Sequence, residues 1–241
     1  MYKDDLLGSR ETENSETDKF THSTIGGGRK VKEIRMKYFT DPLSPAGYAM
    51  DQQLKNLTVN YGRFFEIEYH MGGLIPLWEL YRNNGIGTHS EMANWWRNAG
   101  DLYNLPITGA VWLTDPPQSS FPPSIAFKAS QLQGKQKSLA FLRRMMEMLF
   151  LENKNICNWK YLEVAAQKSK LDIGRLKQDQ VGKGRRHFEE DLLLNEKFGV
   201  MGFPTLFIMG SDSKWEAIEG FQRYDQLELK LLKMMSSQSD G

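Results

Sequence analysis

The chain has 241 residues, of which 40% are hydrophobic and 25% charged, and its formal net charge at pH 7 is +1. This length and composition predict one globular domain, or one domain with a large insertion. A charge so close to zero gives no reason to expect nucleic acid or a membrane surface as a partner. No apolar run approaches the roughly 18 residues that span a bilayer.

Residues 1–32 form a polar segment that ends in Gly26-Gly27-Gly28. The segment lacks the apolar core and the cleavage site of a signal peptide, so we expect a disordered tail and a cytoplasmic protein. Cys157 is the single cysteine of the sequence. A single cysteine cannot form an intramolecular disulfide, and this low cysteine content is consistent with a protein in a reducing compartment.

The first structured part predicts a strand, a helix and a second strand. Residues 34–39 are typical of a strand, which Thr40-Asp41-Pro42 closes. A helix is expected from about Pro45, because proline suits the first helical turn, and it ends at 61–62. Residues 64–71 alternate strictly between apolar and polar side chains and form the second strand. Together they predict a right-handed βαβ unit.

Residues 77–197 contain no convincing strand and predict a block of helices. Helices are expected from a capped start at Ser90, over 138–152, from an N-cap at Asp172, and over 186–198. The Trp and Met side chains of this block are most simply its core, although a Met-rich surface could also serve a promiscuous binding groove. These side chains are Trp95, Trp96, Trp112, Met145, Met146 and Met148.

The last part returns to strands, at 204–209 and 214–218, and ends in a helix over 224–235. The order βαβ, helical block, ββα is that of an α/β thioredoxin fold with a large helical insertion. The expected boundaries are 33–76 and 198–238 for the thioredoxin-fold domain and 77–197 for the inserted helical domain.

Four short motifs resemble the DsbA-like thioredoxin-fold family, and its cytoplasmic FrnE branch most. They are 39–43 (FTDPL), 70–74 (HMGGL), 126–134 (AFKASQLQG) and 200–205 (VMGFPT). Each motif alone is weak, but four in the right order at spacings that fit one fold are specific. The resemblance covers about residues 34–235.

Residues 61–65 (YGRFF) and 126–156 are also similar to the SpxH protease adaptor of the same superfamily. This second resemblance implies a protein that holds a client rather than one that exchanges disulfides.

Redox-active members of the DsbA-like family carry Cys-x-x-Cys at the N-terminus of the first helix. There the helix dipole and free N–H groups lower the pKa of the first thiol. In this chain the four positions read Ser44-Pro45-Ala46-Gly47. The resemblance therefore places Ser44 at the position of the attacking cysteine and Gly47 at that of the resolving cysteine, and neither can exchange a disulfide.

A second family hallmark is retained. Phe203-Pro204-Thr205 matches the proline that is cis in thioredoxin folds and faces the active-site turn. The resemblance implies that the backbone before this proline can pair with an extended peptide or with glutathione. The substrate-binding residues that it implies are Pro45, Tyr48, Gly72, Gly73, Phe203, Pro204 and Thr205.

Ser44-Pro45 is also similar to the Ser-Pro of kappa-class glutathione transferases and chromene-carboxylate isomerases, which share the fold. In those enzymes the serine donates a hydrogen bond to the glutathione thiolate. This similarity implies an alternative in which Ser44 is catalytic and glutathione is bound. The simpler interpretation is that Ser44 only caps a helix that has lost its cysteine.

Other candidate residues carry weaker signals. Cys157 lies near an expected helix start and could be reactive, but a lone cysteine is more often inert and partly buried. His70, His89 and His187 have no metal-ligand spacing, so no metal site is expected. His70 could line the groove, although a packed histidine is the simpler interpretation.

Two further segments bear on the groove and the surface. The proline-rich loop 115–123 could form the far wall of the groove. The basic cluster 183–186 is interpreted as a solvated turn, because it is too short to indicate nucleic acid.

The leading hypothesis is a protein of the thiol–disulfide oxidoreductase and isomerase family that has lost its redox cysteines. It is expected to bind a peptide or protein client in the retained groove, as an adaptor or holdase, without a cofactor. The alternative is a glutathione-dependent transferase or isomerase of kappa-class type that uses Ser44.

Overall fold

The computed structural model describes residues 34–81, 85–210 and 213–236, so the expected tail over 1–32 lies outside the described residues. The described elements are, in chain order, β1 (Ile34–Thr40), α1 (Pro45–Tyr61), β2 (Phe65–Met71), a 3-10 turn (Trp78–Leu80), α2 (His89–Tyr103), α3 (Val111–Thr114), α4 (Phe121–Gln131), α5 (Lys135–Phe150), α6 (Trp159–Lys168), α7 (Ile173–Val181), α8 (Lys183–Lys197), β3 (Thr205–Met209), β4 (Trp215–Glu219) and α9 (Tyr224–Ser236).

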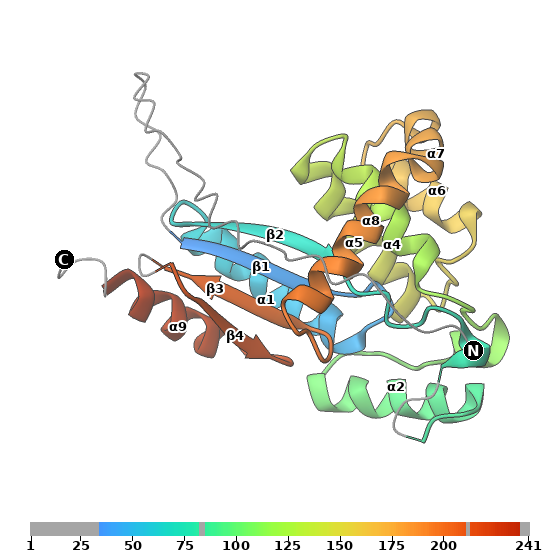
Figure 1. Cartoon of the computed structure of the whole chain (residues 1–241). Coiled ribbons are helices and arrows are strands. Elements are labelled where there is room, and N and C mark those ends of the chain that lie inside the picture. The colour runs from blue at the N-terminus through green and yellow to red at the C-terminus, as the bar shows by residue number, and fades with distance from the viewer. Residues whose placement is uncertain (1–33, 82–84, 211–212, 237–241) are drawn as a thin grey trace, which may run out of the picture. The chain divides into compact units, whose positions relative to one another are not determined.

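The strands form one mixed sheet in the order β2-β1-β3-β4, visible in Figure 1. β1 pairs in parallel with β2, where Ile34 lies opposite Phe65, and antiparallel with β3. β3 in turn pairs antiparallel with β4. The βαβ and ββα halves are therefore joined through β1 and β3 at the centre of the sheet. The expected α/β thioredoxin fold with helices inserted between its halves is confirmed.

The side chains of β1 explain why this strand is central. Ile34, Met36 and Tyr38 are buried in the main hydrophobic core, and the Tyr38 hydroxyl reaches α1 by donating to the Gly47 carbonyl at 3.0 Å. Phe39, on the opposite face, lies 5.6 Å from the Phe207 ring. The end of β1 is thus buried on both faces, as expected for a strand inside a sheet.

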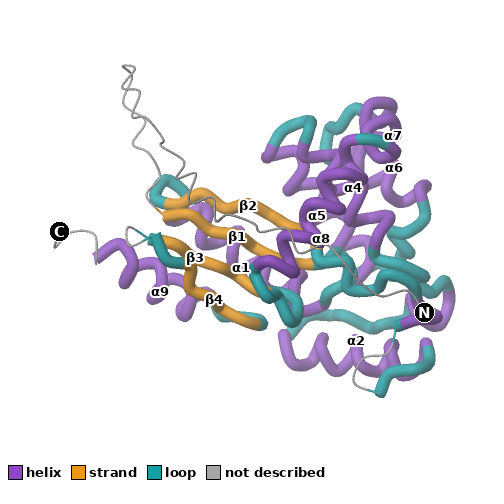
Figure 2. The backbone as a smooth tube through the Cα atoms, viewed as in Figure 1, coloured by secondary structure: helices purple, strands orange, loops and turns teal. Residues whose placement is uncertain are grey.

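The helices between β2 and β3, α2 to α8, are called the insertion here (Figure 2). Asp172 caps α7 as expected, since its Oδ1 accepts the N–H of Arg175 at 2.9 Å. α2 begins earlier than predicted, because Thr88 rather than Ser90 is its N-cap and forms a capping box with Glu91.

Three other helices of the insertion also begin before the expected residue: α5 at Lys135 rather than 138, and α4 and α8, whose expected starts are about 124 and 186. α4 begins at Phe121, because two prolines fit the first turn, where no intrahelical N–H bond is lost. α8 begins at Lys183, so the basic side chains of the cluster 183–186 are exposed to solvent as expected but lie in the first turn of a helix.

The core of the insertion contains the tryptophans and methionines that the sequence assigns to it. Trp96 and Trp112 are each 1% exposed, and their rings lie 5.4 Å apart. Met145, Met146 and Met148 are also buried. Trp95 is the exception, with 40% of its surface exposed, because it lies on the outer face of α2.

The helix that begins at the turn belongs to the same core. Tyr48 of α1 stacks on Phe150 at 5.1 Å, and Phe150 contacts Trp96 at 4.7 Å. No helix among the described residues is long and apolar enough to cross a bilayer.

Candidate functional site

The turn between β1 and α1 is built around Ser44. Its Oγ accepts the N–H of Gly47 at 3.0 Å, which makes Ser44 the N-cap of α1, with Pro45 in the first helical turn. The hydroxyl also lies 3.5 Å from the Phe203 carbonyl oxygen, at the outer limit for a hydrogen bond. Ser44 is only 3% exposed. Its hydroxyl therefore contacts the protein on both sides.

Gly47 occupies a position that has no room for a side chain. A Cβ atom added there would lie 2.4 Å from Oγ1 of Thr40, a distance that real Cβ contacts essentially never show. The position that the resemblance assigns to the resolving cysteine is thus closed by the side chain at the end of β1. Position 47 therefore lacks not only the sulfur atom of a cysteine but also the space for any side chain.

The cis-proline loop meets this turn as expected. The Phe203–Pro204 bond is cis, and the Phe203 ring covers Gly72 so closely that an added Cβ would lie 2.0 Å from it. Gly72 N–H donates to the Thr40 carbonyl at 2.7 Å. The three segments predicted to border a groove therefore come together.

Gly73 has a φ of +67°, a conformation that favours glycine. Loop 115–123 and the helix after it approach from the other side, since Phe121 Cε1 would lie 3.0 Å from a Cβ added at Gly73. This contact places the end of the proline-rich loop beside Gly73, one of the predicted groove residues.

The remaining predicted site residues lie deeper. Pro45, Tyr48, Pro204 and Thr205 are buried, and the Thr205 hydroxyl donates to the Gly202 carbonyl at 2.8 Å. These four residues belong to the packed interior at the turn and not to its accessible surface. The accessible surface here comes instead from the half-buried Ala46, Gly72, Gly73 and Phe203 and from Met201. No ligand tests these assignments, so the predicted site residues stay predictions.

Met201 is 91% exposed, three residues before the cis-proline. A large apolar side chain exposed beside a predicted binding groove is available for contact with a partner. The sequence analysis did not single out Met201, and no local signal distinguishes it from a buried methionine.

Asp41 is a buried carboxyl group that the sequence analysis read only as the end of a strand. It is fully buried, and its oxygens accept the N–H groups of Leu43 and Leu74, both at 2.8 Å. Burial raises the pKa of Asp41 to about 6, while the backbone N–H donors oppose that rise. Asp41 thus links the turn to the segment after β2.

His70 lies at the end of β2 and is packed, with 9% exposure. Its Nδ1 lies 2.8 Å from Asp191 Oδ1 in α8, and Lys128 Nζ of α4 lies 2.9 Å from the other Asp191 oxygen. Asp191 also accepts the N–H of Met71 at 2.8 Å. The sequence analysis missed Lys128 and Asp191, because nothing in the local pattern brings residues so distant in the chain together.

Cys157 has the properties of an inert thiol. Its S–H group donates to the Ser119 carbonyl at 2.9 Å, and burial raises the pKa of Cys157 to about 12. The thiolate, which is the reactive form, is therefore disfavoured near neutral pH.

Together, the mixed sheet, the capped turn and the cis-proline loop define a thioredoxin-fold protein. The chain belongs to the thioredoxin family, because a family model described as Thioredoxin matches residues 38–229.

Similar curated proteins have more specific names than the family model. The ClpXP adapter protein SpxH of Halalkalibacterium halodurans is 34% identical over 194 residues, which are 79% of this chain and 63% of that protein. The ClpXP adapter protein SpxH of Bacillus subtilis is 27% identical over 216 residues, or 88% of this chain and 71% of that protein. The chain thus spans less than two thirds of the first relative.

Among solved structures, a putative protein disulfide isomerase from Nitrosomonas europaea superimposes with a TM-score of 0.72. The superposition covers 85% of this chain and 98% of that protein, at 13% identity, and shows a shared fold. The resemblance to DsbA-like thioredoxin folds and to SpxH adaptors is therefore confirmed.

Proposed function

We propose that this chain is a redox-inactive adaptor that binds a protein client at the turn and the cis-proline loop. The observation that supports the proposal most strongly is the packing at Gly47, where Thr40 Oγ1 fills the space of a resolving cysteine. A protein that exchanged disulfides here would need both sulfur atoms and room for the second one.

The surface at the turn suits an extended peptide. Gly72 and Gly73 are half-buried and have no side chain, so the surface that they expose is backbone. The exposed Met201 offers an adaptable apolar contact near them in the cis-proline loop. Main-chain hydrogen bonds would supply affinity, and side-chain contacts such as that of Met201 would supply specificity.

The curated relatives support the adaptor class, since those quoted above are named ClpXP adapter proteins. We infer that the client of this chain is likewise a protein handed to a protease, in the cytoplasm. The identity of the client is left to experiment.

The glutathione-dependent alternative needs the Ser44 hydroxyl to face a bound thiolate. In this structure that oxygen caps α1, and Ser44 is 3% exposed. The geometry therefore favours the adaptor over the alternative. Calorimetric titration with glutathione separates the two, because tight binding that Ser44→Ala abolishes would favour the enzyme.

The adaptor proposal is tested by capture of clients from the source cytoplasm. The variant Met201→Asp places a charge on the exposed side chain beside the groove and should lose the clients that the parent chain recovers. Leu229→Asp is the matched control, because Leu229 is 55% exposed on α9, outside the segments that border the groove. It should retain the clients.

A second groove variant, Ala46→Trp, adds bulk at a half-buried position of the first helical turn without changing the backbone. If both groove variants remain folded and recover the same clients as the parent, the turn is not the binding surface and the proposal fails.

A further inference from the structure

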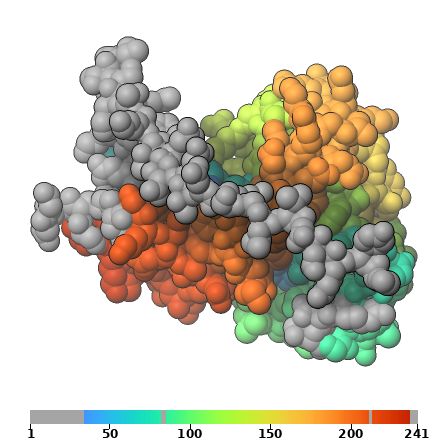
Figure 3. All heavy atoms as spheres, in the orientation of Figure 1, coloured from blue at the N-terminus to red at the C-terminus, as the bar shows by residue number. Residues whose placement is uncertain are grey.

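The insertion contains a second hollow, separate from the cis-proline turn. It is a cavity of about 490 Å³ whose walls come from the start of α4 and from α6, α7 and α8. In the space-filling view the orange segment of α7 and α8 lies directly against the green and yellow segments of the insertion (Figure 3). We call this hollow the insertion groove.

The lining of the insertion groove is mainly apolar. Phe121, Pro122, Ile125, Trp159 and Val181 contribute its hydrophobic surface. Val181 is 80% exposed at the end of α7, so the groove opens to solvent beside an uncovered apolar side chain. Such a surface gains free energy when an apolar group of a partner covers it.

One side chain, that of Phe121, belongs both to the insertion groove and to the surroundings of the turn. Phe121 lines the groove, and the same ring approaches Gly73, where an added Cβ would lie 3.0 Å away. Phe121 is held by Phe188 of α8, whose ring lies 4.9 Å from it. The turn and the insertion groove are therefore neighbours that share the Phe121 ring.

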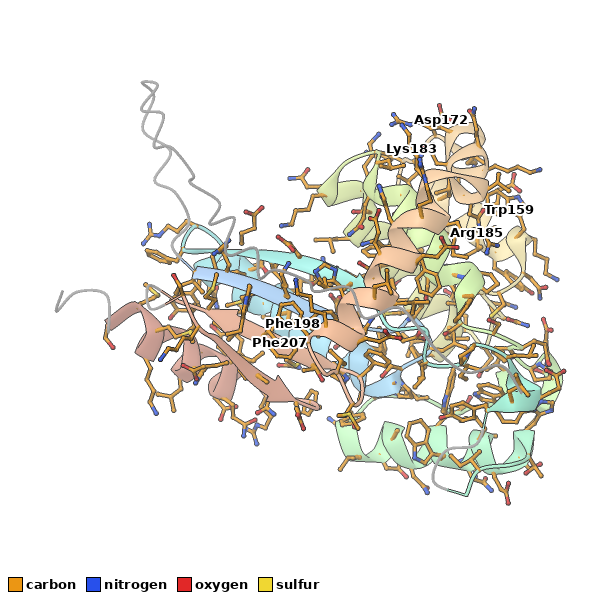
Figure 4. All side chains as sticks on the ribbon, in the orientation of Figure 1. Trp159, Asp172, Lys183, Arg185, Phe198 and Phe207 are labelled. Carbon is orange, nitrogen blue, oxygen red and sulfur yellow. The ribbon has the colours of Figure 1, made fainter. Side chains whose placement is uncertain are left out.

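The ionisable side chains that line the insertion groove, Lys177 and Arg185, are both cations. Lys177 Nζ lies 5.9 Å from the centre of the Trp159 ring. Figure 4 shows Trp159 and Arg185 on the same part of the insertion. Neither cation forms an ion pair with a carboxylate in the part of the chain that the structure describes. An apolar floor with a cationic rim is complementary to an apolar side chain flanked by acidic residues.

We propose that the insertion groove binds an acidic segment of the client, with an apolar side chain inside the cavity and carboxylates against Lys177 and Arg185. This inference rests on the proposed adaptor function and names the chemistry of the segment that lies beyond the turn.

The test uses the peptide fluorescein-Glu-Asp-Leu-Phe-Glu-Asp-amide, labelled at its N-terminus, and measures its anisotropy with the full chain. The double variant Lys177→Glu with Arg185→Glu should weaken binding about tenfold or more, because two attractive pairs become repulsive. Lys183→Glu is the matched control, since Lys183 is exposed in the same turn of α8 but does not line the groove. It should change binding less than about twofold.

Two further probes separate the parts of the proposal. A peptide with Leu-Phe replaced by Ser-Ser should bind weakly, because it leaves the cavity unfilled. Met201→Asp should bind the acidic peptide like the parent chain, so a failure of client capture at the turn does not affect this result. The proposal is overturned if the acidic peptide does not bind, or if Lys183→Glu weakens binding as much as the double variant.

Discussion

At the scale of single residues, Asp41 is a carboxyl group whose protonation depends on folding. Its pKa is raised from 3.8 to about 6 by burial. Between these values the folded chain binds more protons than the unfolded chain, so its stability falls as pH rises through this window. The two backbone N–H groups that it accepts make it a fixed link in the turn.

We therefore expect the parent chain to lose up to about 3 kcal/mol of stability relative to Asp41→Asn as pH rises from about 4 to about 7. The loss arises because burying the ionised carboxylate costs free energy that the neutral amide does not. Urea unfolding at several pH values measures the difference. Asp172→Asn, an exposed N-cap, is the control. A difference between parent and Asp41→Asn that stays constant with pH would contradict the assignment.

At the scale of elements, cysteines introduced into the turn between β1 and α1 test whether its packing leaves room for a disulfide. Ser44→Cys with Gly47→Cys should form a disulfide poorly, because the new Cβ meets Thr40 Oγ1, and such overpacking costs about 1–3 kcal/mol. Adding Thr40→Ala clears the space. The triple variant should form the disulfide, and its first thiol should have a pKa lowered by the helix N-terminus.

Thiol titration after oxidation, in a Cys157→Ser background, measures disulfide formation in the two variants. If the double variant oxidises as fully as the triple variant, Thr40 does not obstruct the turn. That result would contradict the inference that packing at Gly47 excludes a resolving cysteine.

Comparison of the predicted and observed elements shows how much of the fold can be predicted from the sequence. The strands and the end helices were predicted to within about two residues because their periodicity is local. α3 was missed, since a helix of four residues has no periodicity to detect. The start of α6 was expected near Cys157, and Trp159 begins it, but its length was not predicted. The turn was placed correctly, but the roles of Thr40 and Asp41 depend on contacts with Gly47 and Leu74, which no local pattern encodes.

At the scale of the whole molecule, the insertion and the sheet are joined by buried charges. Asp191 of α8 is 4% exposed and Lys128 of α4 is 7% exposed. At the end of β2, Asp191 contacts His70, and Lys128 Nζ donates to the Tyr69 carbonyl at 3.4 Å. A buried ion pair of this kind adds little net stability over an apolar pair of similar size, but breaking it is costly. The rings of Phe198 and Phe207, labelled in Figure 4 and 4.9 Å apart, continue the contact where the insertion returns to β3.

The two charges should therefore be strongly coupled. Asp191→Ala is expected to cost about 3–5 kcal/mol, because it leaves the Lys128 ammonium buried without its partner and the Met71 N–H without an acceptor. Lys128→Met in the same chain removes the orphaned charge, so the double variant should be at least about 2 kcal/mol more stable than the sum of the single changes predicts. Denaturant unfolding of the four proteins completes the cycle. The exposed pair Arg223 and Asp225, whose atoms lie 3.2 Å apart, is the comparison and should show a coupling of about 0.5 kcal/mol or less. Equal couplings at the two pairs would mean that the buried charges do not join the insertion to the sheet, and that other contacts, such as the hydrogen bond from Asn195 to the Met71 carbonyl, hold the two together.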